Sequence, residues 1–150
     1  MSASTSAPQP SDGLAAWGAL LQVHALLIRD MDATMQRESG LALRSYDVLR
    51  QLHQGGGALP QRELEQRVLL SQSGLSRLLT RLEQGSLVTR QRPADNRRSA
   101  HVALTPTGAD AYAVAQERQQ QEILHRFVAP LTAHQVTCLR DALRAIIDAT

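Results

Sequence analysis

The stretch SQSGLSRLLTRLEQG, Ser71–Gly85, decides the fold. Its apolar residues repeat at the helical spacing i, i+3, i+4, i+7, and they are Leu75, Leu78, Leu79 and Leu82. The opposite face carries hydroxyls, an amide and guanidinium groups, on Ser71, Gln72, Ser73, Ser76, Arg77, Thr80 and Arg81. Helix faces exposed only to water usually carry long charged side chains of both signs. This cationic, short-chained face therefore predicts a binding surface.

Positive charge is concentrated in the same part of the chain. The 150 residues have a net charge of +2, yet the segment 71–105 holds six arginines against only two acidic residues, Glu83 and Asp95. Such a cluster is expected of a surface that binds phosphates. The chain contains no lysine, so its cationic side chains are arginines. The planar guanidinium group of arginine is suited to bidentate hydrogen bonds.

The segment before this stretch predicts a long helix. Only 3% of the residues are aromatic, so aliphatic side chains must form the core, which favours helices. From Leu14 onward the apolar positions follow a 3-4 spacing, typical of a helix with one seam. The seam consists of Leu14, Trp17, Leu21, His24, Ile28, Met31 and Met35. A chain this short has little protein to cover such helices, which favours a dimer.

The rest of the chain predicts further helices and one hairpin. Helices are expected at about residues 43–54, 61–68, 71–84, 106–128 and 133–147. Residues 87–92 and 99–105 are typical of two strands, with turn-forming residues between them. Ser71, Thr105 or Thr107, and Thr132 are the expected helix caps.

A short helix, a tight bridge and a polar-faced second helix, followed by a basic hairpin, predict a winged helix-turn-helix. One α-helix fits the major groove, and its N-terminal part reaches the base edges. We therefore expect Gln72 to pair with adenine, and Arg77 or Arg81 to pair with guanine. The serines and Thr80 are expected to contact bases or phosphates.

The hairpin is expected to act as the wing. Arg97 and Arg98 suit an adjacent minor groove, where narrow A·T tracts attract guanidinium groups. Asp95 either orients one of these arginines or shapes the turn. Arg90 and Arg92, on the strand, are either DNA contacts or solvated charges.

About fifty residues, from Leu59 to Gly108, resemble the MarR (multiple antibiotic resistance regulator) family of bacterial transcription factors. The resemblance is carried by SGLSRLLTRLE, LVTR and ALTPTG, which are specific in combination. The long flanking helices match as well. One departure lies in the wing, where the family usually has an aspartate closely followed by arginine and this chain has Asn96 between Asp95 and Arg97.

The resemblance implies a mainly α fold with a small β-hairpin wing. Residues 1–13 are then a disordered tail, and residues 14–150 form a single domain. Within it, residues 42–105 are the winged helix-turn-helix, and residues 14–39 and 106–150 are dimerisation helices.

The resemblance also implies a homodimeric repressor that binds a pseudo-palindromic operator in double-stranded DNA. Repression would be relieved by a small aromatic or anionic ligand, or by oxidation. Family ligands bind where the dimerisation and DNA-binding parts join, which makes Trp17 and His24 candidate ligand contacts. Packing in the core or in the interface is the alternative role for both residues.

Other classes of protein are disfavoured. No phosphate loop, nucleophile elbow or paired-carboxylate motif indicates an enzyme, and no pair of the five histidines has chelating spacing, so no metal or cofactor is expected. The N-terminus lacks the features of a secretory signal, and no apolar run approaches the ~18 residues of a membrane span. A cytoplasmic protein is expected.

Two alternative functions remain open. The winged fold also serves protein–protein assembly, but such a surface should expose hydrophobic residues where this chain has arginines and hydroxyls. A redox regulator acting through Cys138, the single cysteine, is the second alternative, although a free cysteine is more often a small buried hydrophobe.

Overall fold

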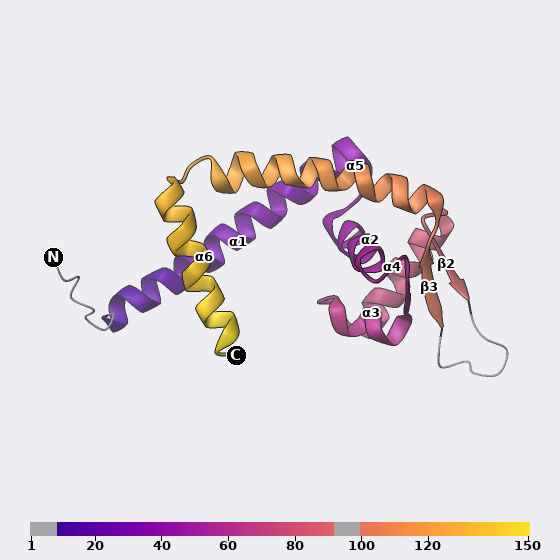
Figure 1. Cartoon of the computed structure of the whole chain (residues 1–150), viewed down its shortest axis with the longest axis horizontal. Helices are drawn as coiled ribbons and strands as arrows, with labels where there is room; N and C mark the ends of the chain where they lie inside the picture. Colours follow the sequence, from indigo (N-terminus) through magenta and orange to yellow (C-terminus); the bar gives the residue numbers. More distant parts are fainter. Residues whose placement is uncertain (1–8, 92–99) are drawn as a thin grey trace.

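The computed structural model describes residues 9–91 and 100–150. It confirms a mainly helical fold with a small antiparallel sheet (Figure 1). The elements are α1 (Pro10–Ser39), α2 (Leu43–Gln54), β1 (Ala58–Pro60), α3 (Gln61–Arg67), α4 (Gln72–Gln84), β2 (Val88–Gln91), β3 (His101–Leu104), α5 (Pro106–Ile123), the π-helix η1 (Leu124–Val128) and α6 (Ala133–Asp148).

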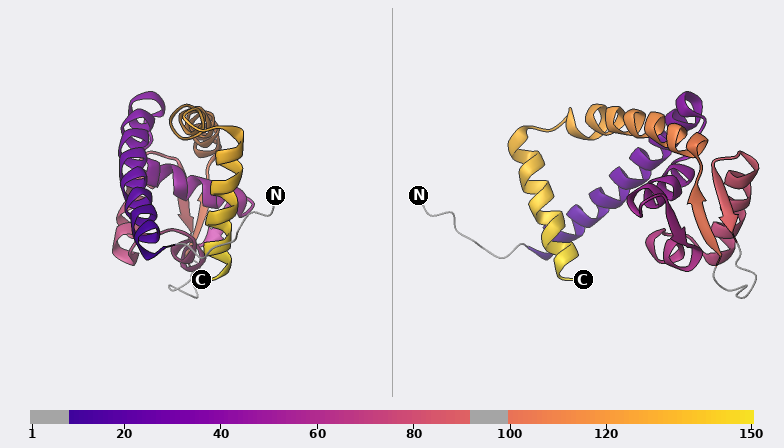
Figure 2. Two further views of the ribbon diagram at one scale, coloured as in Figure 1. Left: turned by 90° about the vertical axis from the view of Figure 1, so that its left-hand side faces the viewer. Right: turned by 45° about the vertical axis from the view of Figure 1, so that its right-hand side comes forward.

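The helices and the sheet form a compact part and an extended part (Figure 1). The compact part contains α2, α3, α4 and the sheet, in the strand order β1-β3-β2. The extended part contains α6 and most of α1, and α5 connects it to the sheet. Figure 2 shows α1 leading away from the compact part and α6 at the end of α5 that is far from the sheet.

The core lies in the compact part. All four leucines of α4 are buried, as their spacing predicts. They pack in one cluster with Leu49 and Leu52 of α2, Leu64 of α3 and Val102 of β3. Burial of this leucine face fixes the orientation of α4, so its opposite face points outward.

The predicted helix caps agree with the structure. The Gly74 N–H donates to Ser71 Oγ at 3.2 Å, which caps α4. Of the two threonines considered for α5, Thr105 is the cap. Thr132 caps α6 in a capping box with Gln135. Each side-chain oxygen satisfies a backbone donor that the first helical turn leaves without a partner.

Two boundaries differ from the sequence prediction. Helix α1 begins at Pro10, so residues 10–13, expected in the tail, are helical; proline is well suited to a first helical position. The expected long helix 106–128 is α-helical only to Ile123 and then continues as the π-helix. The remainder of the expected tail, residues 1–8, lies outside the described residues.

Strand β1 was not predicted. It follows Gly56 and Gly57, whose φ angles are +82° and +97°, and it pairs with β3 in the register Leu59↔Val102. Three residues ending in proline carry no strand pattern of their own. Their strand conformation depends on pairing with β3.

Much of the extended part is apolar and exposed. In α1 only Met31, Thr34 and Met35 are buried, and α6 has no buried residue. Contrary to the sequence-based expectation, α1 is long and apolar enough, by length and composition, to cross a membrane, with a mean hydropathy of 1.2 over its best window. Helices that are buried in protein interfaces have the same length and composition.

Candidate nucleic-acid interface

The outward face of α4 presents the side chains that the sequence predicts to contact DNA. Ser71, Gln72, Ser73, Arg77 and Arg81 are exposed, and Ser76 and Thr80 are partly exposed. No acidic residue lies in the first turn of α4. The helix therefore places polar and cationic side chains on one surface.

Some of these hydroxyls are already hydrogen-bonded within the protein. Ser71 Oγ caps α4 and lies 3.3 Å from Ser73 Oγ. Thr80 Oγ1 donates to the Ser76 carbonyl oxygen at 3.0 Å and accepts from Arg90 Nη2 at 3.1 Å. Thr80 thus helps to fix the position of β2 against α4, whatever contact it makes with DNA.

Arg90 is part of an ion pair that joins the wing strand to α4. Its guanidinium donates to Glu83 Oε2 from Nε at 2.9 Å and from Nη2 at 2.6 Å. Its backbone N–H donates to Glu83 Oε1 at 3.2 Å. The side chain is only 15% exposed. Of the two roles left open by the sequence, a solvated charge does not fit this geometry, because Glu83 holds the Arg90 guanidinium; a DNA contact stays a prediction.

The other predicted wing residues, Asp95, Arg97 and Arg98, lie outside the described residues, as does Arg92. The described parts of the wing are β2 and β3, which pair in the register Arg90↔Val102. The ion pair between Arg90 and Glu83 holds β2 against α4.

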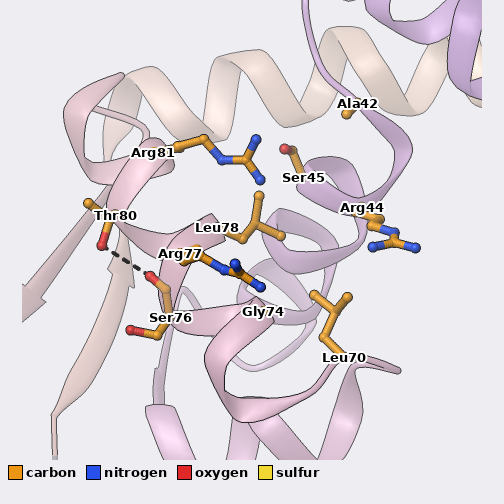
Figure 3. A pocket seen from close by; sticks show the side chains of 10 residues that line it. All are labelled: Ala42, Arg44, Ser45, Leu70, Gly74, Ser76, Arg77, Leu78, Thr80 and Arg81. Atoms are coloured by element: carbon orange, nitrogen blue, oxygen red, sulfur yellow. Dashed lines mark hydrogen bonds between the residues drawn. The ribbon is translucent and has the colours of Figure 1, made fainter.

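A cavity of about 680 Å³ lies between α4 and the beginning of α2 (Figure 3). Arg77 and Arg81 extend from α4 toward the side on which Arg44 and Ser45 of α2 lie. Its lining holds three arginines and no acidic residue. We refer to it as the DNA-facing cavity.

Arg44 is a basic residue of this surface that the sequence analysis missed. The count of positive charge covered the segment 71–105, and Arg44 lies on another helix. The sequence did offer one indication that Arg44 belongs to a basic surface. Arg44 is the second residue of a predicted helix whose first turn has no acidic residue.

A second cavity, of about 480 Å³, lies where the extended and compact parts meet. We call it the effector cavity. It is lined by His24 and Ile28 of α1, by Leu43, Arg44, Tyr46, Asp47 and Arg50 of α2, by Leu69 and Leu70, and by Gln119 and Ile123 of α5. Of the two predicted ligand residues, His24 lines this cavity, whereas Trp17 does not and is exposed on α1.

The polar groups of the effector cavity have different charge states. Arg50 donates to Asp47 Oδ1 at 2.6 Å, so these two charges compensate each other. Burial, together with the neighbouring Tyr112, raises the pKa of Tyr46 to about 12. Tyr46 is therefore a neutral hydroxyl at physiological pH, stacked on Tyr112 at a ring distance of 5.7 Å. The cavity combines an apolar wall with hydrogen-bonding and cationic groups.

Cys138 lies exposed on α6. Its Sγ atom is 3.5 Å from His134 Nε2. The thiol thus has a partner on its own helix and is not part of either cavity.

The comparisons with known proteins agree with this geometry. Residues 39–99, which include α4 and β2, match the sequence model of the MarR family. No curated protein matches the chain in sequence.

Solved structures of MarR regulators resemble the whole chain. AbsC, a MarR family transcriptional regulator from Streptomyces coelicolor, is 25% identical with a TM-score of 0.80, and the alignment covers 97% of both chains. Sco3205 from the same organism, in complex with DNA, is 20% identical with a TM-score of 0.82, covering 98% of this chain and 92% of that one.

A third structure is the organohalide-sensing regulator RdhR-CbdbA1625 bound to 2,4-dichlorophenol. It is 16% identical with a TM-score of 0.79, covering 100% of this chain and 90% of that one. The family match covers the helix-turn-helix and β2, and the AbsC similarity extends over the flanking helices. Residues 39–99 match the MarR family, and the whole chain has the fold of MarR-family winged helix-turn-helix transcriptional regulators.

Proposed function

We propose that the protein is a homodimeric transcriptional repressor whose DNA binding is released by a small aromatic or anionic effector. The observation that carries this proposal is the effector cavity. It is lined by α1 of the extended part, by the connecting helix α5 and by α2 of the compact part, so an occupant would touch both parts. We expect the protein in the cytoplasm, where its DNA target lies.

The dimer is supported by the apolar surface of the extended part. A groove on α6 is lined by Phe127, Val136, Leu139, Leu143 and Ile147, together with two arginines. A neighbouring hollow is lined by Val23, Leu26 and Leu27 of α1 and by Leu139 of α6. Large apolar patches of this kind mark interaction sites. A second copy would bury them and would place two α4 helices for two operator half-sites.

The effector class follows from the lining of the cavity. Ile28, Leu43 and Ile123 provide apolar contacts for a ring, and the neutral Tyr46 hydroxyl offers a hydrogen bond. Arg44 provides a positive charge. The 2,4-dichlorophenol bound by RdhR-CbdbA1625 is a small phenol of this chemical class.

The effector acts by binding better to one arrangement of the dimer. A form whose two α4 helices are wrongly spaced for successive major grooves binds DNA weakly. A preference of the effector for that form by ~1–3 kcal/mol changes operator occupancy.

Effector titration tests this proposal. The protein is bound to labelled DNA from upstream of its own gene, and benzoate or 2,4-dichlorophenol is added while anisotropy is recorded. Release of DNA is expected with at least one of the two probes. Stable binding in the presence of both, across their soluble range, contradicts an effector of this class.

Oxidation by way of Cys138 is the second candidate, favoured by the exposure of the thiol and by its contact with His134. A Cys138→Ser variant separates the two candidates. Loss of a peroxide response that the wild type shows would favour the redox candidate, and an unchanged response excludes it.

A further inference from the structure

Arg44 lies between the two cavities. It lines the DNA-facing cavity together with Arg77 and Arg81, and it also lines the effector cavity together with His24 and Tyr46. Among the described residues, Leu70 is the only other one that lines both. A single charged side chain therefore borders the site of the effector and the surface that faces DNA.

The Arg44 guanidinium is not committed to any partner among the described residues. Arg44 is exposed, and it makes no hydrogen bond or ion pair with residues 9–91 or 100–150. Two other arginines differ in this respect, because Arg50 is held by Asp47 and Arg90 by Glu83. The free side chain can turn toward either cavity without breaking an existing contact.

From its position the Arg44 guanidinium can reach an anion that enters either cavity. DNA presents phosphates to the surface formed by α4, and arginine binds phosphate and carboxylate with the same planar, bidentate geometry. In the effector cavity the Asp47 charge is already compensated by Arg50, so Arg44 is the cation that remains for an anionic occupant.

We propose that Arg44 couples effector binding to DNA release by direct competition for its guanidinium. Without effector, Arg44 binds a backbone phosphate beside α4. An anion in the effector cavity draws the guanidinium to itself, and the phosphate contact is lost. Because coupling is reciprocal, DNA weakens effector binding by the same factor. This inference rests on the proposed anionic effector.

The competition is testable without a known effector, because a carboxylate can be placed in the cavity by mutation. Gln119→Glu adds a negative charge to the wall that α5 contributes. Gln120→Glu adds the same charge one residue further along α5, at an exposed position outside the cavity lining. Each substitution is made with Arg44 present and in the Arg44→Ala background.

DNA affinity is measured by fluorescence anisotropy at several salt concentrations. Arg44→Ala is expected to weaken binding and to reduce the salt slope by about one per protomer, as for any lost phosphate contact. Gln119→Glu is expected to weaken binding about fivefold, the upper range of a partly exposed ion pair. In the Arg44→Ala background Gln119→Glu should have no further effect, and Gln120→Glu should change affinity little in either background.

Two results overturn the inference. One is an unchanged affinity and salt slope for Arg44→Ala. The other is an equal loss from Gln119→Glu with and without Arg44. Circular dichroism and thermal melting verify that each variant is folded.

The inference and the proposed function fail in different ways. If neither benzoate nor 2,4-dichlorophenol releases wild-type protein from DNA, the proposed effector class is wrong. The single and double substitutions at Gln119 and Arg44 still measure whether a negative charge in the effector cavity weakens DNA binding through Arg44. If benzoate releases wild-type and Arg44→Ala protein to the same extent, the effector response stands and the role of Arg44 is wrong.

Discussion

At the scale of single residues, the sequence indicated which side chains of α4 face outward but not which of them are bonded to one another. Thr80 has the polar character of a DNA contact, yet it is hydrogen-bonded to Ser76 and Arg90. Arg90 comes close to Glu83 because the chain reverses after α4, with a φ of +57° at Ser86. That reversal is a tertiary feature, so residue spacing alone does not predict the pair.

Replacing Arg90 should therefore have a structural effect. Arg90→Ala is expected to lower the free energy of unfolding by about 1–2 kcal/mol, because it removes charge-assisted hydrogen bonds in a partly buried place. It should also weaken DNA binding, since β2 loses its attachment to α4. Urea denaturation followed by circular dichroism measures the first effect.

The matched control is Arg67→Ala, which breaks the more exposed pair with Glu63 on α3. Such a pair within one helix contributes about 0.2–0.5 kcal/mol. Equal losses for the two variants would show that the Arg90 pair stabilises the protein no more than a surface pair does.

At the scale of elements, the sequence predicted most helix boundaries because their signals are local. Thr105 and Pro106 begin α5 as expected, but the reason for glycine at position 108 is not local. Thr105 Oγ1 donates to the Ser86 carbonyl oxygen at 2.6 Å and accepts from the Gly108 N–H at 2.9 Å. A Cβ atom at Gly108 would collide with the Leu87 carbonyl group. Glycine thus allows α5 to begin directly against the segment before β2.

Gly108→Ala is expected to lower the free energy of unfolding by about 1–3 kcal/mol, the usual cost of overpacking. Gly13→Ala, in α1, is the control, because a Cβ atom there meets nothing within 4 Å. That variant should be neutral or slightly stabilising, since alanine favours helices. Chemical denaturation of both proteins measures the difference, and a neutral Gly108→Ala would show that the backbone shifts without cost.

At the scale of the whole molecule, the sequence predicted the partition into a DNA-binding part and flanking helices, and it predicted an apolar seam on α1. It did not predict the composition of the effector cavity, because that cavity is assembled from α1, α2, the bridge before α4, and α5. Trp17 lies two turns from His24 on the same seam, yet only His24 lines the cavity. A seam indicates which face of a helix is apolar but not where along it another element packs.

A charge in the α6 groove should disrupt the proposed dimer. Leu143→Asp places a carboxylate among Phe127, Leu139 and Ile147, and it is expected to shift the protein toward the monomer in analytical ultracentrifugation. Gln54→Asp, at an exposed position at the end of α2, introduces the same charge outside the groove. It should leave the mass of the assembly, measured by ultracentrifugation, unchanged. An unaltered sedimentation profile for Leu143→Asp would place the dimer interface elsewhere.

The central claim is that the polar face of α4 binds DNA as part of a dimer. The most direct test is fluorescence anisotropy with DNA from upstream of the protein's own gene, compared with scrambled DNA, across a salt series. Binding of a dimer with preference for the native DNA is predicted, with affinity falling steeply as salt rises. Arg77→Ala should reduce that preference. Folded protein that fails to bind either DNA at low salt would contradict the claim and would favour a role in protein–protein assembly.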